Sequence, residues 1–456
     1  MITIKKIAAA AMLLAHLFVL NAQEAENKRH ISLDEYRKLA LANNLDVHNA
    51  EYELEKSKQV LAGAFTNYFP KVSASGVLVK PNIFGGGAAA GFSTDAHFPD
   101  KTIHVDEAIN FSDPIGAWFG TITFTQTLFA GGRIFYSNKL AKKGVEASTH
   151  KLQLKHDEIF AEAESKYYQF MLLEELIKTL DAYKKTLDNL YAKVSQALEQ
   201  GVVSRSDYLR VSLKREELVI QQDEAIQMRV VALQDLKLFA GIKDLSEIVV
   251  AADLSGIVEP TFDAANFPAR LSARPEFNLL TIQRDAAQLE EVITRGSYLP
   301  SIELGLGFLR SDFYFNGSFL ANTTGFYQDF AGFLLFNIPM SAWWEGYHKM
   351  NEKRLARKSA EEQLEVNSNY LILDMRNKMT VWQTAYKQVK LAEIGLAYAK
   401  NNREEYEQKY TAGINTLNDY LMALALEHEN TTKLDQAKTR YFITRTAFNA
   451  AIGLKE

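Results

Sequence analysis

Two long stretches of the sequence, residues 115–259 and 340–456, contain no proline. A proline inside a helix costs about 3 kcal/mol, so proline-free stretches rich in Ala, Leu, Glu, Lys and Gln favour long helices. Within 131–199 the apolar side chains recur at helical spacing. A helix of that length extends about 100 Å, so it has to pack beside other long helices and cannot lie inside a compact globular domain.

Four short segments break this helical pattern and are predicted to be strands. In 301–308 large apolar residues alternate with small or polar ones, and in 121–128 threonine occupies every second position. The alternation is weaker in 71–79 and 330–338. Alternation of this kind is typical of a barrel wall with lipid outside and water inside, although one face of a soluble β-sandwich has the same pattern. Four strands are too few to close a barrel, so a barrel requires several copies of the chain.

The N-terminus has the features of an export signal. Lys5 and Lys6 precede an apolar stretch at 7–20, and the small residue Ala22 offers a cleavage site. The apolar stretch is shorter than the roughly 20 residues of a membrane-spanning helix, so residues 1–22 are interpreted as a signal peptide. The absence of cysteine excludes disulfides, thiolate metal sites and a lipid-modified N-terminal cysteine. A net charge of -5 gives no indication of a nucleic-acid partner.

The chain contains an internal repeat. The segment 67–70 (NYFP) returns as 297–300 (SYLP), an offset of about 230 residues, and beyond the strands the offset becomes 212. At this second offset Gly201 matches Gly413, and Gly241 matches Gly453. A repeat of more than 200 residues is too long for a solenoid unit, so we interpret it as a duplicated domain.

The predicted organisation follows from this duplication. The first repeat covers 23–241, the second covers 276–456, and a linker at 242–275 separates them. In the first repeat a helix is followed by a strand (71–79), an extracellular loop (80–116), a strand (117–128), a long helix (131–199), a hairpin tip (201–207) and a helix (208–240). In the second repeat a helix is followed by a strand (300–309), an extracellular loop (310–329), a strand (330–340), a long helix (345–411), a hairpin tip (413–419) and a helix (420–452).

Two matching turns lie between the paired helices, at 201–207 and 413–419. Each begins with a glycine, which favours the left-handed conformation that ends a helix. Ser204 and Thr416 can cap the next helix, and Asp207 and Asp419, three residues later, can complete a capping box. Each turn is therefore predicted to be the tip of an antiparallel helical hairpin. The alternative is that some of these aspartates line a narrow pore mouth and bind cations or hold the mouth shut; the structural and functional roles are compatible.

The sequence resembles the TolC-like outer-membrane efflux protein family over nearly its whole mature length. The resemblance rests on the Tyr-x-Pro motifs at 68–70 and 298–300 and on Arg274-Pro275-Glu276-Phe277. It also rests on the two G-x-x-[ST]-x-x-D-x-L turns, which end at Leu209 and Leu421.

The resemblance implies a mixed α and β membrane protein in the outer membrane of a Gram-negative-type bacterium. In such a homotrimer each protomer gives four strands to a shared barrel of about twelve, in contact with outer-membrane lipid. The barrel continues into a helical coiled-coil tunnel in the periplasm. The tips meet a periplasmic adaptor protein, which links the duct to an inner-membrane pump of the RND or ABC type. The duct conducts substrates passively.

The resemblance also assigns roles at the tips. Asp419 matches the acidic position of the second turn, which in the family can form a ring at the periplasmic mouth. With Asp207, its counterpart in the first turn, it is a candidate for a gate there. The candidate adaptor contacts are Gly201, Ser204, Leu209, Gly413, Thr416 and Leu421. Some family members carry a second aspartate three residues after the gate position, where this chain has Met422.

The sequence gives less support to two other classes of function. No catalytic motif is found, so neither an enzymatic activity nor a cofactor is expected. His97 and His104 lie in the long first loop with three aspartates, and a solvated loop is the preferred interpretation over a metal site. A periplasmic coiled-coil structural protein remains the alternative; it accounts for the helices and leaves the alternating strands unexplained.

Overall fold

The computed structural model describes residues 28–79, 96–98, 101–103, 116–243, 247–250, 254, 256–314 and 325–454. The expected signal peptide lies outside these residues, as do the side chains of His97 and His104. The chain divides into two compact units. The helix unit comprises Met1–Lys56, Glu146–Ile282 and Glu362–Glu456, and the sheet unit comprises Ser57–Val145 and Gln283–Glu361.

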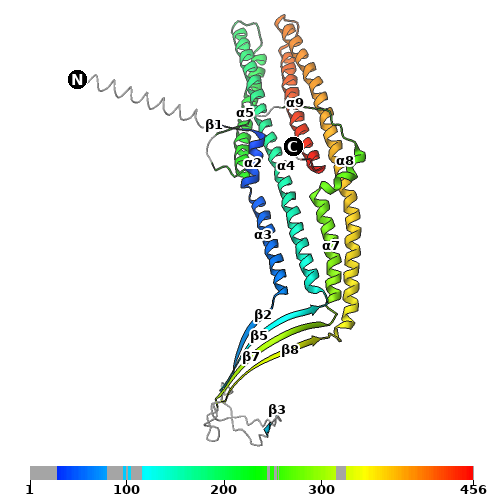
Figure 1. Cartoon of the computed structure of the whole chain (residues 1–456). Coiled ribbons are helices and arrows are strands. Elements are labelled where there is room, and N and C mark those ends of the chain that lie inside the picture. The colour runs from blue at the N-terminus through cyan, green and yellow to red at the C-terminus, as the bar shows by residue number, and fades with distance from the viewer. Residues whose placement is uncertain are drawn as a thin grey trace, which may run out of the picture. The chain divides into compact units, whose positions relative to one another are not determined.

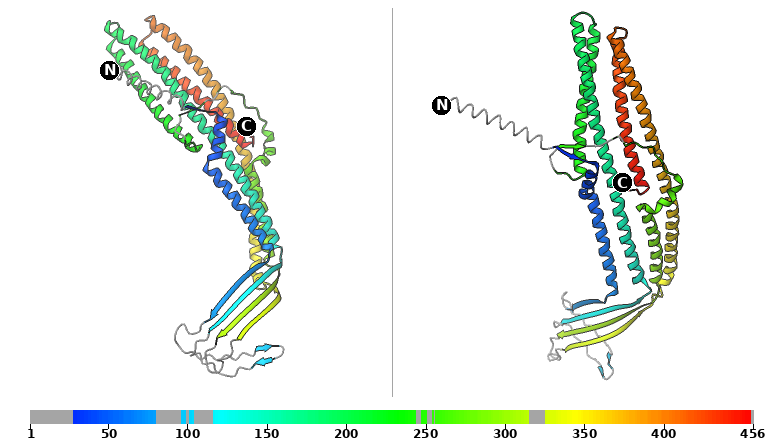
Figure 2. Two further views of the ribbon diagram at one scale, coloured as in Figure 1. Left: turned by 60° about the vertical axis from the view of Figure 1, so that its left-hand side comes forward. Right: turned by 45° about the horizontal axis from the view of Figure 1, so that its top comes forward.

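Long helices make up most of the described chain (Figure 1). They are α2 (Leu33–Asn43), α3 (Leu45–Phe65), α4 (Arg133–Glu199), α5 (Arg205–Phe239), α7 (Pro275–Gly296), α8 (Ala342–Thr411) and α9 (Leu417–Ala451). In the helix unit α5 runs beside α4 and α9 runs beside α8, in both views of Figure 2. None of the described helices combines the length and the apolar character that crossing a membrane would require.

In the helix unit, α4 and α5 are held together by an apolar seam and by a series of ion pairs. The buried residues of α5 in the seam recur every seven residues, at Val211, Leu218 and Ala225. Beside the seam, three ion pairs join the antiparallel helices; the second lies about one heptad from the first, and the third lies two heptads beyond the second. They are Lys166–Asp235 (2.7 Å), Glu174–Arg229 (2.5 Å) and Asp188–Arg215 (2.6 Å). This seven-residue repeat keeps the two helices in one register.

Short elements complete the helix unit. Strands β1 (Lys28–Ile31) and β6 (Glu247–Val250) pair in parallel. The Tyr167 hydroxyl donates a hydrogen bond to the Ile31 carbonyl (3.0 Å), and the Tyr36 hydroxyl donates to the Leu236 carbonyl (3.1 Å). The expected linker also contains the short helices η2 (Ala264–Asn266), α6 (Phe267–Arg270) and η3 (Leu271–Ala273), and the Phe267 side chain is fully buried among α8 and α9.

The sheet unit is built on one four-stranded antiparallel sheet, in which the strands lie side by side in the order β2-β5-β7-β8 (Figure 1). Their bounds are β2 (Lys71–Val79), β5 (Gly116–Ala130), β7 (Ser301–Tyr314) and β8 (Gly325–Asn337). A small separate hairpin pairs β3 (Ala96–Phe98) with β4 (Lys101–Ile103). The large sheet is open, and β2 and β8 are its edges.

The register separates a polar face of the large sheet from an apolar one. On the polar face, Ser73 and Ser75 share hydrogen bonds of 2.6 Å with Thr123 and Thr121 across the β2–β5 pair. The apolar face is formed by alternate residues of the same strands, among them Val72, Ile122, Phe124, Leu306, Phe330, Leu334 and Phe336. In the single chain the large side chains of this face are exposed on β8, whereas most of those on β7 are half-buried.

Several element boundaries differ from those expected from the sequence. The expected loop 310–329 is strand at 310–314 and 325–329, because backbone pairing continues beyond the alternating pattern. The expected strand 330–340 ends at Asn337, just before Pro339, which has no N–H to donate. The expected helices 208–240 and 420–452 each begin three residues earlier, because the capping residue directly precedes them.

The edge strand β8 carries large apolar residues on both faces. Phe333 lies across Gly305 of β7, and a Cβ placed on that glycine would lie 2.1 Å from the Phe333 ring. A Cβ on Gly307 would meet only the Thr123 methyl, at 3.9 Å. The Phe333 ring therefore fills the space left by the absent side chain, as aromatic residues do opposite glycine in sheets.

We expect Gly305→Ala to lower the free energy of unfolding by about 1–3 kcal/mol, because the Phe333 ring would have to leave its position. Gly307→Ala is the matched control and should change the stability little. Urea unfolding of the folded protein in detergent measures both. Equal stability of the two variants would contradict the packing of Phe333 on Gly305.

Candidate functional site: the two hairpin tips

The first feature of both tips is how the incoming helix ends. Gly201 and Gly413 have φ angles of 74° and 71°, in the region that favours glycine. At the first tip Val202 N–H donates to the Ala197 carbonyl (2.8 Å), and at the second Ile414 N–H donates to the Lys409 carbonyl (2.8 Å). These are Schellman motifs, which satisfy the last carbonyls of α4 and α8 within two residues. The chain can therefore reverse at once.

The second feature is how the outgoing helix begins. The backbone N–H of Asp419 donates to the Thr416 hydroxyl (3.2 Å), and the Asp419 carboxylate accepts from the Thr416 backbone N–H (3.1 Å). This is a complete capping box. At the first tip Asp207 N–H donates to the Ser204 hydroxyl (3.1 Å), which itself donates to the Asp207 carboxylate (2.7 Å). The predicted N-caps at Ser204 and Thr416 are confirmed.

Aromatic pairs brace both tips. The Tyr191 and Tyr208 hydroxyls share a hydrogen bond of 2.6 Å between α4 and α5. The Tyr410 and Tyr420 rings stack with centroids 5.5 Å apart between α8 and α9. Burial, with a smaller contribution from Glu407, raises the pKa of Tyr420 to about 12. The Tyr420 hydroxyl therefore stays protonated at physiological pH, and the Tyr410–Tyr420 stack is an uncharged contact between α8 and α9.

A groove of about 1090 Å³ lies next to the tips, lined by α4, α8, α9 and residues of both turns. Within it Arg403 donates to Glu427 of α9 and to Glu407 of its own helix, both at 2.8 Å. The His428 ring stacks on Tyr183 with centroids 4.7 Å apart, and burial lowers the pKa of His428. Lys178 and Lys193 also line the groove. At neutral pH it therefore combines neutral aromatic rings with several charged side chains, of which Arg403 is paired within the groove.

The two aspartates predicted to form a gate are both half-buried and held by their caps. Asp207 also lies 3.9 Å from Arg210, and its charge is the second cause, after burial, of the raised pKa of Tyr410. Their carboxylates are thus oriented by local hydrogen bonds. Capping alone accounts for this geometry, and a role at a pore mouth would be additional to it.

The predicted adaptor contacts are not equally accessible. Gly201, Ser204, Gly413 and Thr416 are exposed, and Leu209 is 54% exposed. Leu421, which matches Leu209 in the repeat, is only 5% exposed and packs against α4 and α5. The two leucines differ because α9 turns this position toward the apolar core, whereas α5 turns it outward.

Sequence reasoning missed the most exposed apolar residues of the tips, Val202 and Ile414. Each follows the capping glycine directly, and the two match at the offset of 212 residues. At this position of a Schellman motif a hydrophobic residue usually packs back onto the helix. A large apolar residue after each glycine was therefore visible in the sequence, but its exposure was not.

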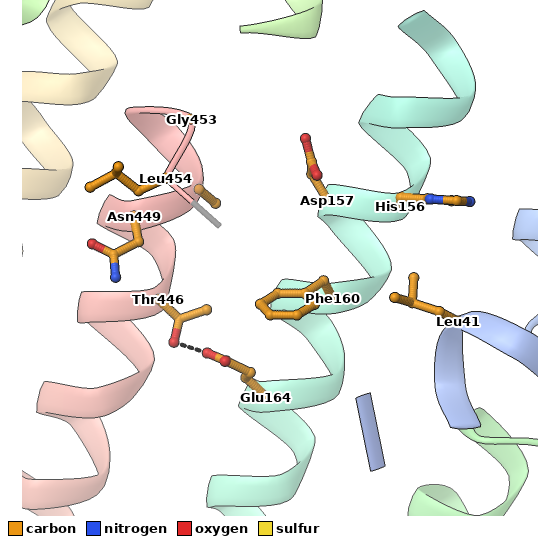
Figure 3. A pocket seen from close by; sticks show the side chains of 10 residues that line it. Leu41, His156, Asp157, Phe160, Glu164, Thr446, Asn449, Gly453 and Leu454 are labelled. Atoms are coloured by element: carbon orange, nitrogen blue, oxygen red, sulfur yellow. Dashed lines mark hydrogen bonds between the residues drawn. The ribbon is translucent and has the colours of Figure 1, made fainter. Parts of the chain in front are cut away.

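A smaller cavity in the helix unit is structural (Figure 3). Glu164 of α4 is almost completely buried, accepts a hydrogen bond from the Thr446 hydroxyl and pairs with Arg37 of α2. Removing one partner of such a buried pair is strongly destabilising. We therefore interpret the Arg37–Glu164–Thr446 group as a structural contact that holds α2, α4 and α9 together. Within the residues that the structure describes, no group of three or more metal-ligating side chains is found.

We expect Thr416→Ala to lower the free energy of unfolding by about 1 kcal/mol, because it removes the hydroxyl that caps α9. Thr416→Ser keeps this hydroxyl and should retain most of the stability. Urea unfolding followed by helical circular dichroism compares the two. A Thr416→Ser variant as unstable as Thr416→Ala would show that the hydroxyl is not the stabilising group.

Comparison with known proteins identifies the fold. The family model described as outer membrane efflux protein matches residues 36–241 and 269–454. The CmeC outer membrane channel of Campylobacter jejuni superposes with a TM-score of 0.74 at 17% identity, over 92% of this chain and 85% of that chain. The open-state MtrE channel of Neisseria gonorrhoeae superposes with a TM-score of 0.74 at 16% identity, over 92% of this chain and 89% of that chain. The outer membrane protein VceC of Vibrio cholerae superposes with a TM-score of 0.72 at 12% identity, over 92% of this chain and 96% of that chain. No curated protein sequence gives a significant match.

At these identities the solved structures show a shared fold, which is mostly helical with some sheet and is the fold of outer-membrane channels. The family match is stronger evidence than these structural likenesses, because its two matched blocks cover most of the chain. It confirms the resemblance seen in the Tyr-x-Pro motifs and the paired turns, and it is a match to a family of channels rather than of enzymes. The chain belongs to the outer membrane efflux protein family.

Proposed function

We propose that the chain is the outer-membrane exit duct of a tripartite efflux or type I secretion system. It would passively conduct substrates delivered by an inner-membrane pump, of the RND or ABC type, through a periplasmic adaptor. The observation that carries this proposal is the likeness to solved outer-membrane channels over 92% of the chain. The two-faced open sheet and the long hairpins supply the physical parts: a wall for the membrane and a helical conduit in the periplasm.

The sheet supports a homotrimer. Among the residues that the structure describes, no strand pairs with the outer side of β2 or of β8. In lipid, each unsatisfied backbone group costs several kcal/mol, so an open sheet cannot remain alone there. Three copies joined edge to edge, β8 of one protomer to β2 of the next, would close a barrel of about twelve strands.

Helix α5 supports the same assembly. Besides its buried seam, it carries a second apolar stripe, which is exposed and consists of Leu213, Ile220, Val231 and Leu238. Its spacing of seven, eleven and seven residues keeps the stripe on one side of the helix. A helix that is apolar on two sides is typical of one buried between two neighbours, and the second neighbour would be the adjacent protomer.

The internal duplication is part of this proposal, with repeats at 23–241 and 276–456, a linker at 242–275 and a signal peptide at 1–22. Helices α5 and α9 each have 35 residues. Four glycines with positive φ form two pairs at a single offset, Gly201 with Gly413 and Gly241 with Gly453. Together with the two blocks of the family match, these features support two copies of one ancestral hairpin-and-strand unit.

The tips are proposed as the periplasmic end of the duct. Val202, Leu209 and Ile414 expose apolar surface that an adaptor could cover. Gly201, Ser204, Gly413 and Thr416 would contribute backbone and hydroxyl groups around them. Asp419 and Asp207 would add negative charge at the mouth, and mutual repulsion or cation binding there would control opening.

We expect Ile220→Glu to prevent or weaken trimer formation, because it places a charge in the proposed interface of α5. Gln221→Glu adds the same charge at the next, exposed position and should leave the assembly intact. Light scattering on the purified protein in detergent gives the oligomeric state. A stable Ile220→Glu trimer would exclude this stripe from the interface.

We expect Asp419→Asn to change single-channel conductance in planar lipid bilayers, with larger or more frequent openings if the carboxylates hold the mouth shut. Asparagine keeps an oxygen that can accept the capping hydrogen bond, so the melting temperature should change little. Asp419→Ala is the companion variant, which loses both the charge and the cap. If only Asp419→Ala differs from the wild type, and only in stability, the residue is a cap and not a gate.

A further inference from the structure

The two helical hairpins of the chain contact each other along α4 of the first hairpin and α9 of the second. The Tyr168 ring stacks on Phe442 with centroids 5.2 Å apart. Nearer the tips, the Tyr183 ring stacks on His428 with centroids 4.7 Å apart. Still closer to the tips, Leu424 of α9 is buried in one cluster with leucines of α4. Because this contact joins the two hairpins of one chain, its strength affects how readily their tips can separate.

His428 is the member of this contact that can change its charge near neutral pH. Its Nδ1 atom is buried and has no hydrogen-bond partner among the described residues. Burial lowers the pKa of His428, so the ring is neutral at pH 7. Burial, with a smaller contribution from Glu217 of α5, raises the pKa of Tyr183, so the stacking partner is uncharged as well. The stack is therefore a neutral contact in a site that offers no acceptor for a proton on Nδ1.

The charged side chains that line the groove around His428 come from three helices. They are Lys178 and Lys193 of α4, Arg403 and Glu407 of α8, and Glu427 of α9. Arg403 donates to both of these carboxylates at 2.8 Å, so both are already paired. A proton on His428 would therefore add a further cation to a groove lined by three, and the stacked arrangement opposes its uptake.

We propose that the Tyr183–His428 stack is an acid-sensitive contact, which holds the two hairpins together while the imidazole is neutral and lets their tips separate when it takes up a proton. This inference rests on the proposed function, in which the tips form the periplasmic mouth of the duct. A buried imidazolium without an acceptor for its Nδ1–H is less stable than one in water, so protonation favours the separated state. The contact is intact above the ordinary histidine pKa of 6.5, and it weakens as the pH falls from there toward the lower pKa of the stacked ring.

A second titratable group of the same contact, Asp435 of α9, responds to acid in the opposite sense. Burial, followed by the nearby charge of Glu175 on α4, raises the pKa of Asp435, and Lys438 of its own helix lowers it. Lys178 pairs with Glu175 at 2.7 Å. Protonation of Asp435 removes its repulsion from Glu175 and so strengthens the contact between α4 and α9. A release of the hairpins in acid can therefore come from His428 and not from Asp435.

The test compares the wild type with His428→Phe, whose ring can stack on Tyr183 but cannot take up a proton. The chain has no cysteine, so Thr179→Cys on α4 and Thr431→Cys on α9, which both line the groove, can carry a pair of spin labels. The distance between the labels is measured on the full-length protein in detergent, from about pH 7.5 to about pH 5.5, the range in which a histidine titrates. Single-channel openings in planar lipid bilayers are recorded over the same range.

We expect acid to lengthen the label distance in the wild type and to raise the ratio of open to closed channels about two- to tenfold, the effect of losing one aromatic contact. His428→Phe should show neither change. His48→Phe is the matched control, because His48 lies on α3 beside Glu51 and outside this contact, and it should respond as the wild type does. Asp435→Asn should also keep the response. Tyr183→Leu removes the stack from the other helix, and it should show the longer distance already at neutral pH.

The outcomes separate this inference from the proposed function. A wild type whose label distance does not change in acid overturns the inference, as does an acid response that persists in His428→Phe. If the hairpins separate in acid but a conducting channel opens no more often, the contact does not control the mouth, and the inference is overturned too. If the protein conducts at no pH although the label distance responds through His428, the duct proposal fails while the acid-sensitive contact is supported.

Discussion

Backbone hydrogen bonding at the edges of the four-stranded sheet is the constraint on which the rest of the structure depends. Between β2 and β8 every strand has a neighbour, and beyond these two strands the ladder is open. A face that carries Phe330, Leu334 and Phe336 cannot remain exposed in water, and an open edge cannot remain in lipid. In the proposed assembly further copies would pair the open edges, and lipid would cover the apolar face. The apolar stripe of α5 would acquire a partner in the same assembly.

At the hairpin tips the backbone groups also need hydrogen-bond partners, and here neighbouring residues in the sequence supply them. At Gly201 and Gly413 a Schellman motif ends one helix, and three residues later an N-capping serine or threonine begins the next. Because these caps satisfy the backbone, the apolar side chains after the glycines are free to face outward. Asp419 serves this cap and also carries a charge at the end of the hairpin. The gating role proposed for Asp419 is compatible with its role in the cap, since the cap fixes where its carboxylate lies.

Much of this arrangement was predictable from local sequence. The missing prolines indicated the long helices, and the alternation in 121–128 and 301–308 indicated strands whose two faces differ. Glycine followed by Ser or Thr and then Asp identified both tips. The prediction was wrong where long-range pairing sets the ends of the strands. Strands β7 and β8 continue into the expected loop because they hydrogen-bond to each other there. The prediction also failed at Leu421, which the repeat equated with Leu209 although only one of them is exposed.

The sequence by itself determined the helical and strand periodicities, the helix caps and the internal repeat. Each of these depends on residues within a few positions of one another or on comparison of the two halves. Only the tertiary structure decided which side of each element has a partner. Trp343 and Trp344 are adjacent and chemically identical, yet one is bonded to Tyr298 and the other projects outward. That difference arises from the packing of α8 on α7, a contact between segments about fifty residues apart, which no local pattern encodes.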